Sequence, residues 1–388
     1  MAWSDPPRLR TVEDPEEDRR ATWLELFFDL VFVVAIAQLS AGIGSDVTAR
    51  DFLIFAGLFV PVWWAWVGFT FYAERFDTDD VIHRLLMLGG MFAVGALAST
   101  VPHAYRGETA GFAVSYAVLR TITVALNMRA WWHLPPARVL LNVYIPAFSA
   151  AIVLFLVSLA FESPTRYLIW AAALLLDLGV PLVSVKRIES IPIHASHMPE
   201  RIGLLTIIVF GETVRAVVVG TESVSWTIGS GIVAAFGFTI AAALWWIYFD
   251  YLDPSLVRRT VRAGQIYLYV HLPLLIGLAG IGVGVKLAIK ATAGDELSEG
   301  AAWSLGGGVA LMMASLAVIH FVRTRARVDL DVWLRVGTAG VGIAVAAVGT
   351  HLGPYAVTGV LAAVLVVHVA LEVARHGLHQ GLADPPAN

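Results

Sequence analysis

The 388-residue sequence contains no cysteine and few charged residues. The absence of cysteine excludes disulfide bonds, thiolate metal sites and cysteine nucleophiles. Charged residues make up only 14% of the chain, whereas soluble domains average about 25%. The net charge of −4 gives no reason to expect a nucleic-acid partner. Because hydrophobic residues make up 58%, the composition indicates a protein that lies in lipid.

Common enzyme motifs are also missing. The sequence has no HExxH, no GxSxG and no phosphate-binding loop ending in Gly-Lys-Ser/Thr. The stretch GIGVG (280–284) indicates close helix packing through Gly280 and Gly284, since no βαβ pattern surrounds it. His194 and His197 are near enough in sequence for a shared metal ion but are more typical of a solvated loop. We therefore expect neither an enzyme nor a metal site, and the sequence identifies no cofactor.

Long apolar runs predict an all-α, polytopic membrane protein. A helix needs about 20 mostly apolar residues to cross the hydrocarbon core. Residues 1–20 lack the apolar core of a signal peptide and are expected to form a tail, as are residues 377–388. The twelve predicted spans are 23–43, 52–73, 84–102, 110–132, 139–161, 166–185, 201–220, 226–250, 264–288, 301–322, 333–350 and 354–374, the last two separated only by HLGP.

Lysine and arginine are distributed unevenly between the loops on the two sides. If the N-terminus is inside, nineteen of the 26 Lys and Arg residues fall in cytoplasmic segments and five on the other side, while Arg120 and Arg215 fall within spans. Cytoplasmic loops of membrane proteins carry this excess. We expect both termini in the cytoplasm and the protein in the bacterial inner membrane.

The two halves of the chain resemble each other. Trp63-Trp64 in PVWWAWVGFTFYAERFD aligns with Trp245-Trp246 in ALWWIYFDYLDP, and the same offset of 182 places Gly95 on Gly277. The pattern predicts two parallel six-helix repeats at 21–185 and 200–376, with a cytoplasmic connecting loop at 186–199. Functional sites of such repeat proteins tend to lie between the repeats.

Charged residues recur inside the predicted spans, where they are costly and often functional. At 100° per residue, Glu25 and Asp29 share one face of the first helix with Thr22, Ile36 and Ser40. A second charged stripe on the span 201–220 joins Arg201, Glu212 and Arg215, and this half also begins with an acid, Glu200.

Arg120 and Asp177 lie near the middle of their spans. Because arginine cannot easily lose its charge, Arg120 is expected to pair with one of Asp29, Asp177 and Glu212. His271 and His368 also fall within spans; they either titrate as proton carriers or, as is more usual, are hydrogen-bonded core histidines.

The stretches TWLELFFDLVFVVAIAQLS and HMPERIGLLTIIVFGETV resemble the signatures of the bacterial low temperature requirement A family of integral membrane proteins. The family name implies a cold-growth phenotype and no settled biochemical activity. The first stretch is also more distantly similar to the first, pore-lining helix of two-repeat potassium channels with an Arg-x-x-x-Phe-Ser-Asp motif, with Phe27-Phe28-Asp29 on Phe-Ser-Asp. This chain departs from that motif, with Trp23 in place of the arginine and Leu204 where Asp29 would recur.

Three interpretations of the charged residues remain open. They form a polar pathway or binding cavity between the repeats, a structural network that fixes the helices, or a catalytic centre. The candidate pathway residues are Glu25, Asp29, Arg120, Asp177, Glu200, Arg201, Glu212 and Arg215. The main hypothesis is a channel or transporter for a small ion or solute, and the alternative is a non-transporting sensor or stress-adaptation protein. The expected partners are the bilayer and the transported species. A homodimer is an alternative to a monomer.

Overall fold

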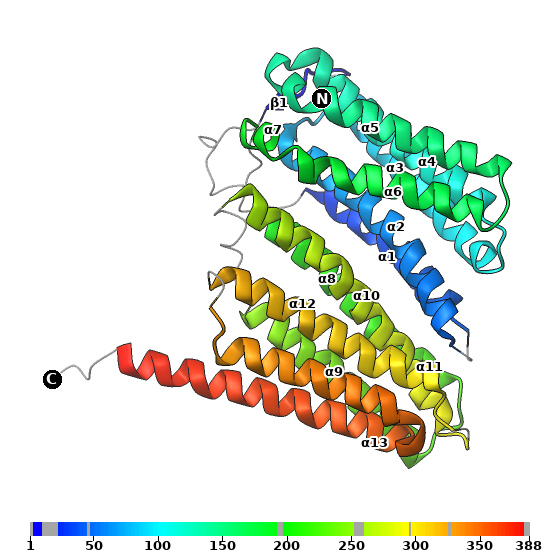
Figure 1. The fold of residues 1–388 in the computed structure, drawn as a ribbon, viewed down its shortest axis with the longest axis vertical. Helices are drawn as coiled ribbons and strands as arrows, with labels where there is room; N and C mark the ends of the chain where they lie inside the picture. Colours follow the sequence, from blue (N-terminus) through cyan, green and yellow to red (C-terminus); the bar gives the residue numbers. More distant parts are fainter. Residues whose placement is uncertain are drawn as a thin grey trace. The chain divides into compact units, whose positions relative to one another are not determined.

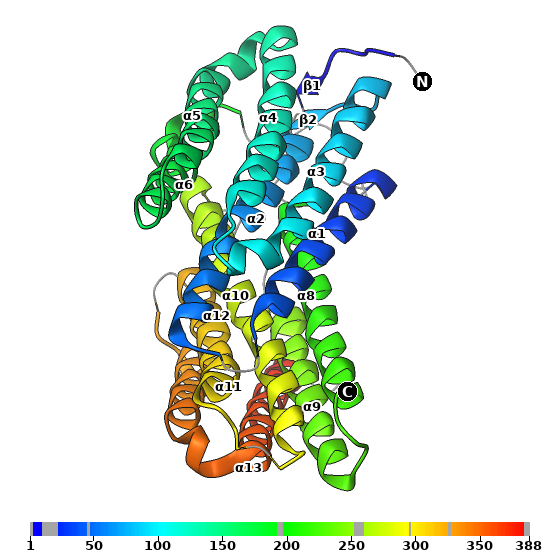
Figure 2. The ribbon, with the colours of Figure 1, turned by 90° about the vertical axis from the view of Figure 1, so that its right-hand side faces the viewer.

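The structure, a computed structural model, describes residues 3–9, 22–44, 47–191, 197–251, 260–294, 296–324 and 327–383. These residues are almost entirely α-helical (Figure 1), which confirms the predicted fold class. The β-structure within these ranges is one short antiparallel pair between β1 (Arg8–Leu9) and β2 (Phe76–Asp77) (Figure 2). Most of the predicted N-terminal tail, His194 of the connecting loop and the last five residues lie outside the described residues.

The number of membrane-spanning segments depends on the last helix, α13 (Leu330–Ala383). In the described ranges, 11 helices are long and apolar enough to cross a membrane when α13 is counted once. Gly353 interrupts α13 with φ 74° and ψ 172°, a conformation that essentially only glycine adopts. The two arms run antiparallel (Figure 1), and Arg335 pairs with Glu372 at 2.7 Å, although a straight helix would separate them by about 55 Å. The predicted division at HLGP is confirmed, and twelve long helical segments result.

The chain forms two compact units. The first contains Met1–Gly42, Leu53–Leu205 and Pro254–Ile266. Within it, α1 packs on α3, and each helix from α3 to α6 packs on the next. Its helices are α1 (Trp23–Gly42), most of α2 (Ala49–Arg75), α3 (Val81–Tyr105), α4 (Ala110–His133), α5 (Arg138–Val157), α6 (Thr165–Val183), α7 (Val185–Glu189) and the start of α8 (His197–Glu222), with short 3-10 turns η2 (Pro135–Ala137) and η3 (Ser158–Ala160).

Aromatic side chains of α2 fill the interior of the first unit. Trp63, Trp64, Trp66 and Phe69 are all buried. The ring of Phe69 also packs against Phe28 of α1, with ring centroids 4.8 Å apart. Burial of these large side chains stabilises the bundle, and it brings α2 close to the charged residues of α1 and α4.

The second unit contains Ile43–Phe52, Thr206–Asp253 and Tyr267–Asn388. Glycine allows α10 to approach α12 closely: a Cβ on Gly277 or on Gly308 would lie 2.7 Å from the carbonyl oxygen of the other. A Cβ on Gly284 would lie 2.5 Å from the Leu305 backbone nitrogen, which confirms its predicted packing role. The helices are the rest of α8, α9 (Ile228–Tyr251), most of α10 (Val261–Ala291), α11 (Glu299–Ala302), the π-helix η5 (Trp303–Gly307), α12 (Gly308–Arg323) and α13.

The sequence repeat stays a prediction. The two compact units divide α8 and α10 between them, whereas the predicted repeats were bounded at 21–185 and 200–376. The aligned tryptophan pairs also have different surroundings. Trp63 and Trp64 are each 3% exposed, while Trp245 and Trp246 are 40% and 43% exposed.

Candidate functional site

The first helix begins with a capping box. The backbone N–H of Glu25 donates to Thr22 Oγ1 at 3.2 Å, and the backbone N–H of Thr22 donates to Glu25 Oε2 at 2.9 Å. The Thr-x-x-Glu spacing supports this reciprocal arrangement, and the helix dipole favours a carboxylate there. Glu25 therefore has a structural role at the start of α1, and the box fixes the position of its carboxylate.

Asp29 lies one turn further along α1 and accepts two hydrogen bonds through Oδ1. Trp66 of α2 donates from Nε1 at 2.8 Å, and Arg201 of α8 donates from Nη2 at 2.9 Å. Arg201 Nη1 also lies 3.4 Å from Glu25 Oε2. We call Glu25, Asp29 and Arg201 the Asp29 cluster. In this cluster one guanidinium contacts two buried carboxylates.

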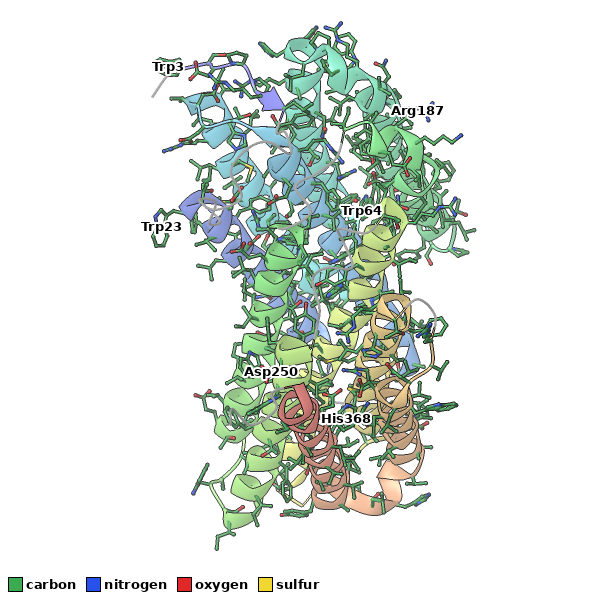
Figure 3. All side chains as sticks on the ribbon, turned by 90° about the vertical axis from the view of Figure 1, so that its left-hand side faces the viewer. Trp3, Trp23, Trp64, Arg187, Asp250 and His368 are labelled. Atoms are coloured by element: carbon green, nitrogen blue, oxygen red, sulfur yellow. The ribbon has the colours of Figure 1, made fainter. Side chains whose placement is uncertain are left out.

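Four of the five residues predicted to share one face of α1 are buried, namely Glu25, Asp29, Ile36 and Ser40. The fifth, Thr22, precedes the helix and is exposed. Trp23 is 88% exposed and points away from the bundle (Figure 3). The arginine that opposes Asp29 is therefore supplied by α8, from a position 172 residues away, and not by the position of Trp23.

Arg120 and Asp177 form a second buried pair in the first unit. Arg120 Nη2 of α4 lies 2.5 Å from Asp177 Oδ1 of α6, and both side chains are 1% exposed. Tyr116 donates its hydroxyl to Asp177 Oδ2 at 3.2 Å, and the guanidinium lies over the Phe148 ring, 4.4 Å from its centroid. The expectation that Arg120 is charge-paired is confirmed, and its partner among the three candidates is Asp177.

Gly68 of α2 makes space for this pair. A Cβ at Gly68 would lie 2.6 Å from Arg120 Nη1, so a larger residue would displace the guanidinium. The fold thus reserves a position for a charged group in the middle of an apolar bundle.

A third group of charges lies at the α2–α3 turn, where sequence reasoning did not place a site. Asp80 precedes α3 and accepts from the His83 backbone N–H at 2.8 Å. It also pairs with Arg129 of α4 and accepts from the Asp5 backbone N–H at 2.8 Å. Burial alone would raise the pKa of Asp80, but hydrogen bonds from Arg129 and these two amides outweigh it and hold the pKa below its usual value.

Glu212 and Arg215 form a separate ion pair. In the second unit, Glu212 pairs with Arg215 of its own helix, at 2.7 Å from Arg215 Nε to Oε2 and 2.5 Å from Nη2 to Oε1. The Glu212 side chain is 4% exposed and that of Arg215 48%. Glu200 is exposed. The predicted α8 stripe is therefore divided, because Arg201 pairs with α1 while Glu212 and Arg215 pair with each other.

The second unit also holds a buried charged group that the sequence analysis missed. Arg335 pairs with Glu372 across the two arms of α13 at 2.7 Å. His368 (Figure 3) lies 3.3 Å from Glu372 and bonds through Nδ1 to the Thr338 hydroxyl at 2.8 Å. The i,i+4 spacing of His368 and Glu372 was the available signal.

His271 matches the usual pattern of a core histidine. Its Nδ1 lies 2.6 Å from the Tyr267 carbonyl oxygen and therefore donates to it, and its Nε2 lies 3.0 Å from the Tyr248 hydroxyl. Both ring nitrogens thus have hydrogen-bond partners, as expected for a structural histidine.

Comparison with known proteins identifies the family. The family profile described as bacterial low temperature requirement A protein (LtrA) matches residues 20–370. A protein of Rhizobium meliloti (strain 1021) described as uncharacterized is 28% identical over 292 residues, which cover 70% of each chain. No solved structure is significantly similar. The profile match extends from α1 into the second arm of α13, and the chain therefore belongs to the bacterial low temperature requirement A family of integral membrane proteins.

Proposed function

We propose that this multi-pass protein conducts or transports a small ion or solute across the bacterial inner membrane. The observation that carries the proposal is the buried carboxylate of Asp29 within α1. Asp29 pairs with Arg201 through Oδ1, and its second oxygen, Oδ2, has no hydrogen-bond partner within the described residues. Ionisable groups within membrane spans are expensive, and they commonly mark ion and proton pathways.

A buried carboxylate oxygen favours a cationic species. Either a proton or a small cation could bind there. Asp29 Oδ2 is buried and has no hydrogen-bond partner within the described residues, so it is the atom best suited to receive either one. The proposal involves no catalytic step.

The Arg120–Asp177 pair is different, and we exclude it from the candidate pathway. It is balanced, since one guanidinium faces one carboxylate, and it lies against the aromatic ring of Phe148. We assign it a structural role, in which it holds α4 against α6. The candidate pathway is thereby reduced from eight residues to the Asp29 cluster within the first unit.

The alternative is a non-transporting membrane protein in which all these charges only hold helices together. The observation that favours it is burial: Asp29 and Arg201 are 1% and 3% exposed, and buried ion pairs can serve to fix the register of helices. The two functions differ in one respect, because only the first requires passage of a solute.

A flux assay on the purified full-length protein in liposomes tests the proposal. Vesicles would be loaded with a pH-sensitive or cation-sensitive dye and exposed to gradients of H⁺, Na⁺, K⁺ and, separately, amino acids and anions. We expect protein-dependent flux of a cation. Protein-free vesicles and vesicles with the heat-denatured protein are the controls. Absence of flux for every solute, from protein that is correctly folded, would favour the alternative.

A further inference from the structure

The connection between α12 and α13 brings together one histidine and two aspartates, which are residue types that commonly bind metal ions. None of the three belongs to the Asp29 cluster. His320 Nε2, in the last turn of α12, lies 2.8 Å from Asp329 Oδ2 and 3.8 Å from Asp331 Oδ2. One ligand atom from each residue lies within 4.8 Å of the other two. Asp329 immediately precedes α13, and Asp331 lies in its first turn.

Each of the two carboxylates is held by its other oxygen. Asp329 Oδ1 accepts from the Val332 backbone N–H at 3.0 Å, and Asp331 Oδ1 pairs with Arg375 from the second arm of α13. The Oδ2 atoms of both aspartates are therefore directed at His320 Nε2. Metal ligands in proteins are usually oriented by such outer hydrogen bonds.

We propose that His320, Asp329 and Asp331 bind a divalent transition-metal ion, with Zn²⁺ the best match. One nitrogen and two carboxylate oxygens, with a fourth position left for water, are a usual donor set for zinc. Zinc–ligand bonds of about 2.1 Å at tetrahedral angles place ligand atoms roughly 3.4 Å apart. The separations of 2.8 and 3.8 Å lie on either side of that value, so shifts of about 0.5 Å would form the site.

Charge and access are compatible with this assignment. The two carboxylates balance a divalent cation, while Arg375 offsets part of their charge and moderates the affinity. The Asp329 side chain is 37% exposed, so an ion can reach the site from solvent. By the Lys/Arg distribution this connection is predicted to be cytoplasmic. The site is independent of the proposed transport.

A network of hydrogen bonds alone would make the same contacts without binding an ion. In that case Asp329 caps α13 and its second oxygen simply accepts from His320. The two explanations agree on stability, and they differ in whether the protein binds metal at one ion per chain.

Metal titration of the full-length protein separates them. The protein would carry a tag without histidines, be stripped with EDTA in detergent, and be dialysed against Zn²⁺, with bound metal measured by mass spectrometry. We expect one Zn²⁺ per chain, and Co²⁺ in its place should give the visible absorption of a four-coordinate site. A wild-type protein that retains no stoichiometric zinc would overturn the proposal, and this result needs no variant.

Asp329→Asn is the informative variant, because asparagine caps a helix as well as aspartate does but supplies no anionic ligand. It should weaken zinc binding at least about a hundredfold, since loss of an outer partner alone typically costs 10–100-fold. The matched control is His103→Gln, which removes an exposed histidine paired with Glu108 at 3.0 Å and should leave zinc binding unchanged. Equal zinc affinity in Asp329→Asn and wild type would also contradict the assignment.

Discussion

Replacement of Arg120 by alanine should destabilise the protein strongly. The substitution removes the guanidinium that neutralises the Asp177 carboxylate, which is 1% exposed, and the neutral Tyr116 hydroxyl cannot replace that charge. Removing one member of a buried pair typically costs about 3–5 kcal/mol, or roughly a hundred- to several-thousand-fold in the unfolding equilibrium. The loss of the contact with Phe148 adds to it. Unfolding in mixed detergent micelles, followed by tryptophan fluorescence, measures the change.

A double-mutant cycle makes this test specific. Asp177→Leu alone should also be destabilising, because it leaves Arg120 unpaired, whereas Arg120→Met with Asp177→Leu should recover most of the stability. Well-packed apolar residues often replace buried ion pairs at little cost. The control cycle uses Arg84 and Asp79, an exposed pair with side chains 48% and 71% exposed, which should change stability little. Additive effects of the two buried substitutions would refute the reasoning.

Three further predictions concern topology, pH and the α13 break. Reporter tags at the two termini should both be cytoplasmic, and termini on opposite sides of the membrane would mean that the number of spans is odd. The pKa of Asp80 is lowered in the folded state. Its stabilising contribution is therefore present above its unfolded pKa of about 3.9 and is lost as the pH falls through the folded pKa. The stability difference between wild type and Asp80→Asn should be full at neutral pH and vanish in strong acid. Gly353→Ala should cost about 1–3 kcal/mol because φ is +74°, while Gly337→Ala, where a Cβ would meet nothing within 4 Å, should be tolerated in the same unfolding assay.

The helical segments could be predicted from the sequence because membrane insertion imposes a simple length rule. The division at HLGP was predictable too, since a glycine followed by proline interrupts helical hydrogen bonding. The polar face of α1 followed from the helical period alone. These features depend on residues near one another in sequence, and their physical causes are local.

The pairing of charges was only partly predictable. The cost of a buried arginine shows that Arg120 needs a partner, but the choice of Asp177 over Asp29 depends on how α4 packs against α6. Similarly, Arg201 and Glu212 share a helix face and yet serve different partners. Arg335 and Glu372 were missed because each appeared near a helix end, where a solvated charge is usual, and only the reversal at Gly353 brings them together.

The most direct test of the transport proposal is to measure flux and stability on the same preparation of Asp29→Asn. Asparagine can still accept from Trp66, and Glu25 remains to pair with Arg201, so the fold should survive. Loss of the Asp29 charge should then abolish cation flux or change its pH dependence, while Asp79→Asn, at an exposed ion pair, should leave it unchanged. A stable Asp29→Asn protein with wild-type flux would contradict the proposed role of the Asp29 cluster.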